Sequence, residues 1–122
     1  MGSVEIRYSL FWIALEALFG PKDGRELVFR LSQRIAFFLA KSRSGARETA
    51  SIAKKAYDFR SKLVHGNWQP NAKAEDLMGD TENIARSCLV RMTESETLLD
   101  AFMKDSRESF LDNLVFTEEQ TE

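Results

Sequence analysis

The only histidine of this 122-residue chain, His65, follows Arg60 by five positions in the segment YDFRSKLVHG. A neutral imidazole can accept the proton of a ribose 2′-hydroxyl, because its unperturbed pKa of about 6.5 lies close to neutral pH. A neighbouring guanidinium can bind the scissile phosphate and stabilise the charge that develops on its oxygens. Together, the two side chains suffice in principle for RNA cleavage without a metal ion, which leaves a 2′,3′-cyclic phosphate.

The spacing of this pair does not decide whether the two side chains meet. Residues five apart on a regular helix lie about 140° apart around the axis and about 7.5 Å apart along it, so they do not share a face. The pair converges if the helix ends between them, as Gly66 suggests, or if a second copy faces the first across a two-fold axis. On spacing alone, a capping role for His65 near a helix C-terminus is favoured over catalysis.

Metal and disulfide chemistry are not expected. The sequence has no cluster of carboxylates suited to magnesium, and its single cysteine, Cys88, excludes an intramolecular disulfide and a cysteine-rich zinc site. Cys88 falls on the apolar face of a predicted helix, where an inert small hydrophobic residue is expected. We therefore predict no metal ligand and no cofactor.

Charge is distributed unevenly along the chain. The formal net charge is −2, but seven basic and two acidic residues between positions 41 and 65 make that segment +5, whereas the chain from Glu94 onward is −7. A basic helix attracts a polyanion such as RNA, although a solvated helix face is the commoner explanation of such charges. Lys54, Lys55 and Lys62 are the basic candidates for RNA binding.

The elements that must position these residues are predicted to be helices. Six glycines and two prolines are too few for the turns of a sandwich or barrel, and apolar residues recur at helical intervals. We expect helices over about 4–19, 24–41, 46–65 and 74–93, and one kinked or two short helices over about 95–116. The fold class is thus all-α, a bundle with short connections, in one domain spanning 1–122.

Boundary signals refine this expectation. Gly20-Pro21 ends the first helix and Asp23 is a plausible N-cap for the second. The SRSG segment at 42–45 is expected to be a connection, Gly66 a C′ residue, and Gly79-Asp80 a break. The acidic tail, 117–122, is expected to fray, and MGS at 1–3 is typical of a cloning remnant.

The predicted core follows the apolar spacing of these helices. It comprises Tyr8, Phe11, Trp12, Leu15, Leu18, Phe19, Leu27, Leu31, Ile35, Phe38, Ile52, Ala56, Phe59, Leu63, Leu77, Ile84, Cys88 and Met92. Trp12 therefore belongs to the core, whereas Trp68 lies in a polar loop near His65 and is the better candidate for stacking on a base.

No apolar run approaches the roughly 20 residues of a membrane span, and the start lacks the pattern of a signal peptide. A cytoplasmic protein without membrane contact is expected.

Four segments together suggest a family. SLFWIALEALFG at 9–20, RIAFFLA at 34–40, YDFRSKLVHG at 57–66 and FLDNLVF at 110–116 resemble the HEPN superfamily (higher eukaryotes and prokaryotes nucleotide-binding), within it the Apea-like group. The resemblance implies an up-and-down bundle of four long helices plus one or two short C-terminal helices. It also implies dimerisation through the motif-bearing region. Many such proteins are metal-independent endoribonucleases in toxin–antitoxin, anti-phage or RNA-processing systems.

The resemblance also implies roles for individual residues. Arg60 and His65 match the catalytic Arg and His of the R-x4-H motif, and Ser61 stands where the superfamily often has Asn, Asp or His. The Ser hydroxyl can still form a hydrogen bond, but this departure weakens the catalytic assignment. Glu16 matches the recurring acid of the first helix, which orients Arg60 or His65; a surface or buried paired carboxylate is the alternative. Asp58 and Lys62 are more often solvated charges.

Three hypotheses follow. The leading one is a HEPN endoribonuclease, active as a homodimer on single-stranded or loop RNA and regulated by a partner such as an antitoxin. The alternative is a non-catalytic HEPN module that dimerises or binds nucleotide or RNA within a larger protein. The third is a helical protein-interaction domain in which Arg60 and His65 only form caps and ion pairs.

Overall fold

The computed structural model describes the backbone of residues 3–121 and the side chains of residues 5–116. The described chain is helical and contains no strand, so the all-α expectation is confirmed. Six helices follow one another: α1 (Ser3–Phe19), α2 (Leu27–Leu39), α3 (Arg43–Val64), α4 (Ala72–Met92), α5 (Glu96–Met103) and α6 (Arg107–Thr121). None of the described helices is both long and apolar enough to span a bilayer.

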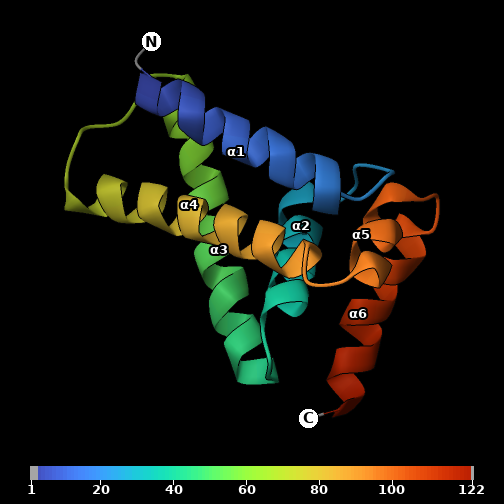
Figure 1. The fold of residues 1–122 in the computed structure, drawn as a ribbon. Helices are drawn as coiled ribbons and strands as arrows, with labels where there is room; N and C mark the ends of the chain where they lie inside the picture. The colour runs from blue at the N-terminus through green and yellow to red at the C-terminus, as the bar shows by residue number, and fades with distance from the viewer. Residues whose placement is uncertain (1–2, 122) are drawn as a thin grey trace.

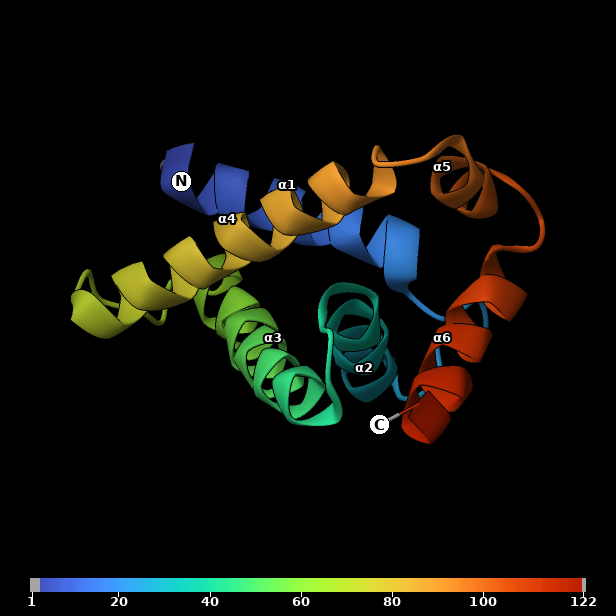
Figure 2. The same ribbon diagram turned by 60° about the horizontal axis from the view of Figure 1, so that its bottom comes forward.

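The helices form two layers (Figures 1 and 2). Helices α3, α2 and α6 lie side by side in one layer, and α1 and α4 cross them steeply in the other, while α5 sits at the edge beside α6. Helices α2 and α3 are antiparallel neighbours, whereas α1 and α4 run in the same direction in both views. The short α2 is thereby surrounded, and it contacts α1, α3, α4 and α6.

Side-chain caps begin three of the helices. The side-chain oxygens of Ser42, Asn71 and Ser95 each accept a hydrogen bond from the backbone N–H three residues later, at 3.1, 2.8 and 3.1 Å. Such a cap satisfies a donor that has no partner within the helix. The expectation that 42–45 forms a connection is wrong beyond its first residue, because Ser42 caps α3 and the next three residues form its first turn.

The start of α2 also differs from the expectation. The helix begins at Leu27 rather than near residue 24, and Asp23 is not its N-cap. The Asp23 carboxylate instead accepts a hydrogen bond from the backbone N–H of Arg25 (2.9 Å) and pairs with Arg30 (2.8 Å). A short acidic side chain that bonds two residues ahead stabilises a turn in competition with a helix.

The end of α3 follows the prediction. Gly66 adopts a φ of 73°, a left-handed conformation that favours glycine. The N–H of Gly66 bonds to the carbonyl of Leu63 (3.2 Å), and the N–H of Asn67 bonds to that of Lys62 (2.8 Å). These two bonds form the Schellman motif that ends many helices.

One expectation for the C-terminal half is wrong. Gly79-Asp80 does not break α4, which is continuous across the pair, because buried residues on both sides of it pack against the core. The backbone of 117–121 forms the last part of α6. The 95–116 segment contains two separate helices, α5 and α6, rather than one kinked helix, so the second of the two expected alternatives is confirmed. Residues 1–2 and 122, and the side chains of 1–4 and 117–122, lie outside the described part of the chain.

The predicted core residues are buried or half-buried. Trp12 and Cys88 are fully buried, and the indole N–H of Trp12 donates to the hydroxyl of Thr81 on α4 (3.2 Å). The Tyr8 hydroxyl donates to the carbonyl of Ala56 on α3. Both bonds satisfy polar atoms that would be costly to bury alone, and they attach α1 to α3 and α4. Trp12 is thus a core residue, as expected.

An arginine cluster at the end of α1 was not predicted. Arg34 of α2 is only 2% exposed. It donates to the carbonyl of Phe19 (3.1 Å), to Glu108 (3.0 and 3.2 Å) and to Asp112 (3.1 Å). Arg107 donates to the neighbouring carbonyls of Ala17 and Leu18. Cations at a helix C-terminus are favourable, so these arginines hold α1 against α2 and α6.

Candidate functional site

Arg60 is positioned by the first helix. Its guanidinium donates from Nη1 to Glu16 Oε1 on α1 (2.9 Å) and to the hydroxyl of Tyr57, one turn back on α3 (3.3 Å). The Tyr57 hydroxyl donates to the same Glu16 oxygen (2.6 Å). The side chains of Glu16 and Arg60 are both 27% exposed. Glu16 thus contacts Arg60, one of the two residues that it was expected to orient.

Tyr57 is a member of this cluster that the sequence analysis did not single out. Its ring packs edge-on against Trp12 with centroids 5.1 Å apart. Burial, and then the hydrogen bond and negative charge of Glu16, raise the pKa of Tyr57, although Arg60 partly offsets them. The only sequence signal for Tyr57 was its position three residues before Arg60, which places both on one helix face.

His65 lies apart from this cluster. It is the exposed C-cap of α3, and its backbone N–H bonds to the carbonyl of Ser61 (3.1 Å). Within the described residues no hydrogen bond joins the His65 and Arg60 side chains. The helix ends at Val64, one residue before His65, so it stays regular from Arg60 to Val64. Within one chain, Arg60 and His65 therefore remain on different faces.

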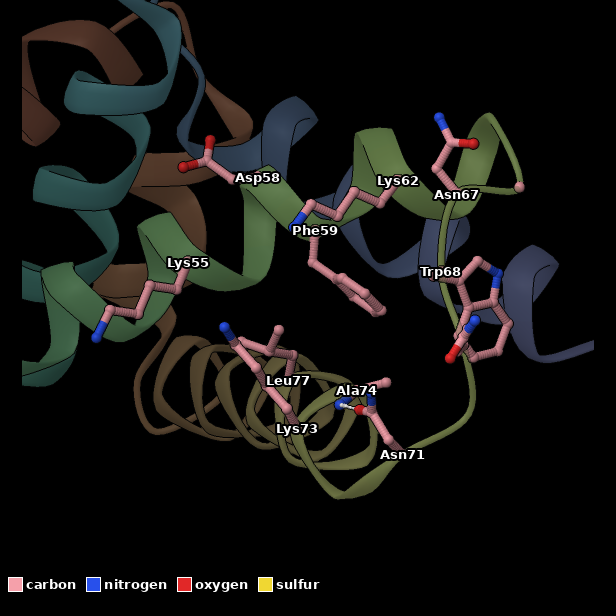
Figure 3. A pocket seen from close by; sticks show the side chains of 12 residues that line it. Lys55, Asp58, Phe59, Lys62, Asn67, Trp68, Asn71, Lys73, Ala74 and Leu77 are labelled. Carbon is pink, nitrogen blue, oxygen red and sulfur yellow. Dashed lines mark hydrogen bonds between the residues drawn. The ribbon is translucent and has the colours of Figure 1, made fainter.

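Three of the four predicted RNA-binding residues line one pocket. Lys55 and Lys62 of α3 and Trp68 of the following loop lie around a groove of about 690 Å³ between α3 and the start of α4 (Figure 3). Lys73 of α4 adds a third amine, and Phe59 lies in the groove with its ring edge-on to Trp68 at 6.2 Å. We call this the lysine groove.

One acid also lines the lysine groove, Asp58, and so does Gly66, the residue after His65. Three amines and one carboxylate leave a positive charge beside two aromatic rings, a combination that suits a phosphate backbone with stacked bases. Lys73 was not predicted, because its place opposite Lys55 and Lys62 depends on how the start of α4 packs against α3. The side chain of Asn71, which caps α4 at Ala74, fixes the place where the helix begins.

Lys54 does not join this groove. It lines a different pocket between α2 and α3, because consecutive helical residues point about 100° apart. Ser61, the residue after Arg60, is exposed. Of the eight predicted site residues, the structure therefore pairs Glu16 with Arg60, gathers Lys55, Lys62 and Trp68, and places His65, Ser61 and Lys54 separately.

Cys88 is buried and free, and burial raises the pKa of its thiol to about 12. In the described part of the chain, no three His, Cys, Asp or Glu side chains gather in a way that would hold a metal ion.

The comparisons with known proteins add nothing to these contacts. No protein-family model matches the chain, and neither a curated protein nor a solved structure matches it significantly.

Proposed function

We propose that this chain binds single-stranded or loop RNA in the lysine groove and, as a homodimer, cleaves it as a metal-independent endoribonuclease of the HEPN type. The observation that carries the proposal is the groove itself. Its lysines and aromatic rings meet at the end of α3, and the groove reaches Gly66, next to the only histidine. A strand bound there passes close to a group that can accept a proton.

In the proposed reaction, the His65 imidazole removes the proton of a ribose 2′-hydroxyl. The 2′-oxygen attacks the adjacent phosphorus, the bond from phosphorus to the 5′-oxygen breaks, and the departing oxygen takes a proton from the imidazolium. A 2′,3′-cyclic phosphate and a 5′-hydroxyl result. Arg60 stabilises the charge on the phosphate oxygens. Glu16 and Tyr57 are positioning residues, because they hold the guanidinium.

A dimer is part of the proposal because one chain keeps Arg60 and His65 on different faces. The proposal also includes a HEPN-like bundle. The antiparallel α2–α3 pair, which carries the motif, supports that arrangement, whereas the parallel course of α1 and α4 does not fit a strictly alternating bundle. The cytoplasmic location, the antitoxin and the role in toxin–antitoxin or antiviral defence come from the sequence expectation and the resemblance alone.

One contact favours a second candidate, a non-catalytic HEPN module that dimerises or binds nucleotide or RNA as part of a larger protein. The Arg60 guanidinium already faces a carboxylate and a phenol. A phosphate would have to share this guanidinium with Glu16, whose negative charge opposes the binding of an anion nearby.

The deciding experiment is incubation of a mixed RNA pool in EDTA with the wild type, with His65→Ala and with Arg60→Ala. We expect cleavage by the wild type and a loss of about 10²- to 10⁴-fold in His65→Ala, the range for removing a general base. Lys104→Ala, an exposed cation on another part of the molecule, is the matched control. The cyclic phosphate is identified by mass spectrometry.

Other outcomes separate the candidates. Salt-dependent RNA binding without cleavage, unchanged in His65→Ala but lost in Lys55→Glu/Lys62→Glu, favours the non-catalytic module. A wild type that neither cleaves nor binds RNA in a salt-dependent manner excludes both candidates and leaves a protein-interaction domain.

A further inference from the structure

A second groove lies between α2 and the first half of α3. It has a volume of about 670 Å³ and is lined by Phe29 and Phe37 of α2 and by Arg43, Arg47 and Lys54 of α3. We call it the arginine groove. Unlike the lysine groove, it contains no Asp or Glu among the described residues that line it. Arg47 and Lys54 thus line a groove whose described lining has no carboxylate.

The cations of the arginine groove lie on one face of α3. Arg43, Arg47 and Lys54 recur at intervals of four and seven residues, as one helix face requires. Arg47 and Lys54 are both exposed, and a phosphate bound between them would be attracted by both charges.

The groove also presents an exposed aromatic ring. Phe29 is 62% exposed, although a phenylalanine gains free energy when it is buried. Phe37 is half-buried in the same groove. An aromatic ring beside cations is the combination that single-strand binders use, because every base has a face that can stack.

Helix α3 connects the arginine groove with the lysine groove. Lys54 lines one and Lys55 the other, so adjacent residues mark the point where the two grooves approach. From Arg47 to Lys62 the helix rises by about 22 Å, at 1.5 Å per residue. From Arg47 through Lys54 and Lys55 to Lys62, successive lining cations are at most seven residues, or about two turns, apart. One lining acid, Asp58, lies between Lys55 and Lys62.

We infer that the arginine groove binds the continuation of the RNA strand that the lysine groove holds, with a base on Phe29 and phosphates on Arg47 and Lys54. The inference rests on the proposed RNA binding, and it makes a single strand that spans both grooves the preferred ligand. A duplex is a poor fit, because its bases are already stacked and do not reach Phe29.

The test measures fluorescence anisotropy of labelled oligouridines from about 4 to about 12 nucleotides, the range of site sizes of single-strand binders. With the long strand, Arg47→Ala/Lys54→Ala lowers the slope of log affinity against log salt by about 1.4, since each phosphate contact contributes about 0.7. Phe29→Ala weakens the same strand by about tenfold. With the shortest strand, each variant changes affinity by about twofold at most, because the lysine groove is intact.

The control is Arg86→Ala/Lys104→Ala, which removes two exposed cations that line neither groove. If the arginine-groove variants bind the long strand like this control while Lys62→Ala/Lys73→Ala weakens it, the inference is overturned and the proposed RNA binding stands. If the wild type shows no salt-dependent binding of any strand, both are overturned. Phe29, Arg47 and Lys54 are exposed, so their variants are expected to fold, and circular dichroism of each variant is the check.

Discussion

Glu16 is the residue on which the cluster around Arg60 depends, because one carboxylate oxygen accepts hydrogen bonds from both Tyr57 and Arg60. The negative charge that stabilises the guanidinium also disfavours the ionisation of the phenol. Arg60 is thus held in place, and Tyr57 reports on the charge of Glu16. This gives a readout for the orienting role of Glu16 that is independent of RNA cleavage.

Replacing Glu16 by Gln is expected to lower the pKa of Tyr57 toward its ordinary value of 10.0. Burial, the largest cause of the elevation, and the opposing effect of Arg60 both remain in the variant. The measurement is a phenolate absorbance titration in a Tyr8→Phe background, which leaves Tyr57 as the only tyrosine. Glu75→Gln, at an exposed site on α4, is the control. A Tyr57 titration that does not move in Glu16→Gln would contradict the described contact.

Arg34 of α2 links this helix to α1 and α6. Its guanidinium joins the last carbonyl of α1 to two acids of α6, at a place that is only 2% exposed. Removal leaves the Phe19 carbonyl and Glu108 without this partner, and losing hydrogen bonds to a charged group costs more than losing neutral ones.

We expect Arg34→Met to lower the free energy of unfolding by about 2 to 3 kcal/mol in urea titrations. Arg86→Met removes an exposed ion pair with Glu82 one turn away on α4 and is expected to cost less than about 1 kcal/mol. Equal effects of the two substitutions would show that Arg34 contributes no more than a surface arginine.

The same cluster predicts how stability depends on pH. Burial favours the neutral form of Glu108, but the hydrogen bonds from Arg34 and from the backbone N–H of Lys22, and the charges of Arg34 and Arg107, outweigh it and lower the pKa of Glu108 below 4.5. Its contribution is therefore complete above the pKa of the unfolded state and is lost as the pH falls through the lower pKa of the folded state.

Urea midpoints measured from neutral pH to well below pH 4.5 test this dependence. In Glu108→Gln the stability at neutral pH is lower than in the wild type, and the decrease toward acid pH is less steep, because the variant has no carboxylate to protonate at this position. Asp100→Asn, at an exposed site on α5, serves as the control. An acid decrease as steep in Glu108→Gln as in the wild type would assign the effect to other carboxylates.

For the whole molecule, a dimer with composite sites makes a specific prediction. Sedimentation should give twice the chain mass of 13.9 kDa. Arg60→Ala and His65→Ala proteins, inactive alone, should recover about a quarter of wild-type cleavage when mixed, because half the dimers are mixed and each has one intact site. Mixing without recovery, in samples shown to exchange chains, would place both residues of each site in one chain.

Local sequence patterns predicted much of this protein. Apolar spacing identified the helices and the buried faces of Trp12 and Phe19, and Gly66 marked the end of α3, because periodicity and a left-handed φ depend on neighbouring residues only. The start of α2 escaped prediction because the Asp23 carboxylate can cap a helix or stabilise a turn, and its bonds to Arg25 and Arg30 stabilise the turn.

In the candidate site, too, some features follow from the sequence and others only from how the helices pack. The sequence alone determined that the segment from 41 to 65 carries excess positive charge and contains the only histidine, since both follow from composition. Only the tertiary structure decided which charges act together: it paired Arg60 with Glu16 and brought Lys73 to Lys55 and Lys62. The physical reason is that electrostatic and hydrogen-bond energies depend on distances between side chains, and for residues far apart in the chain those distances are set by helix packing.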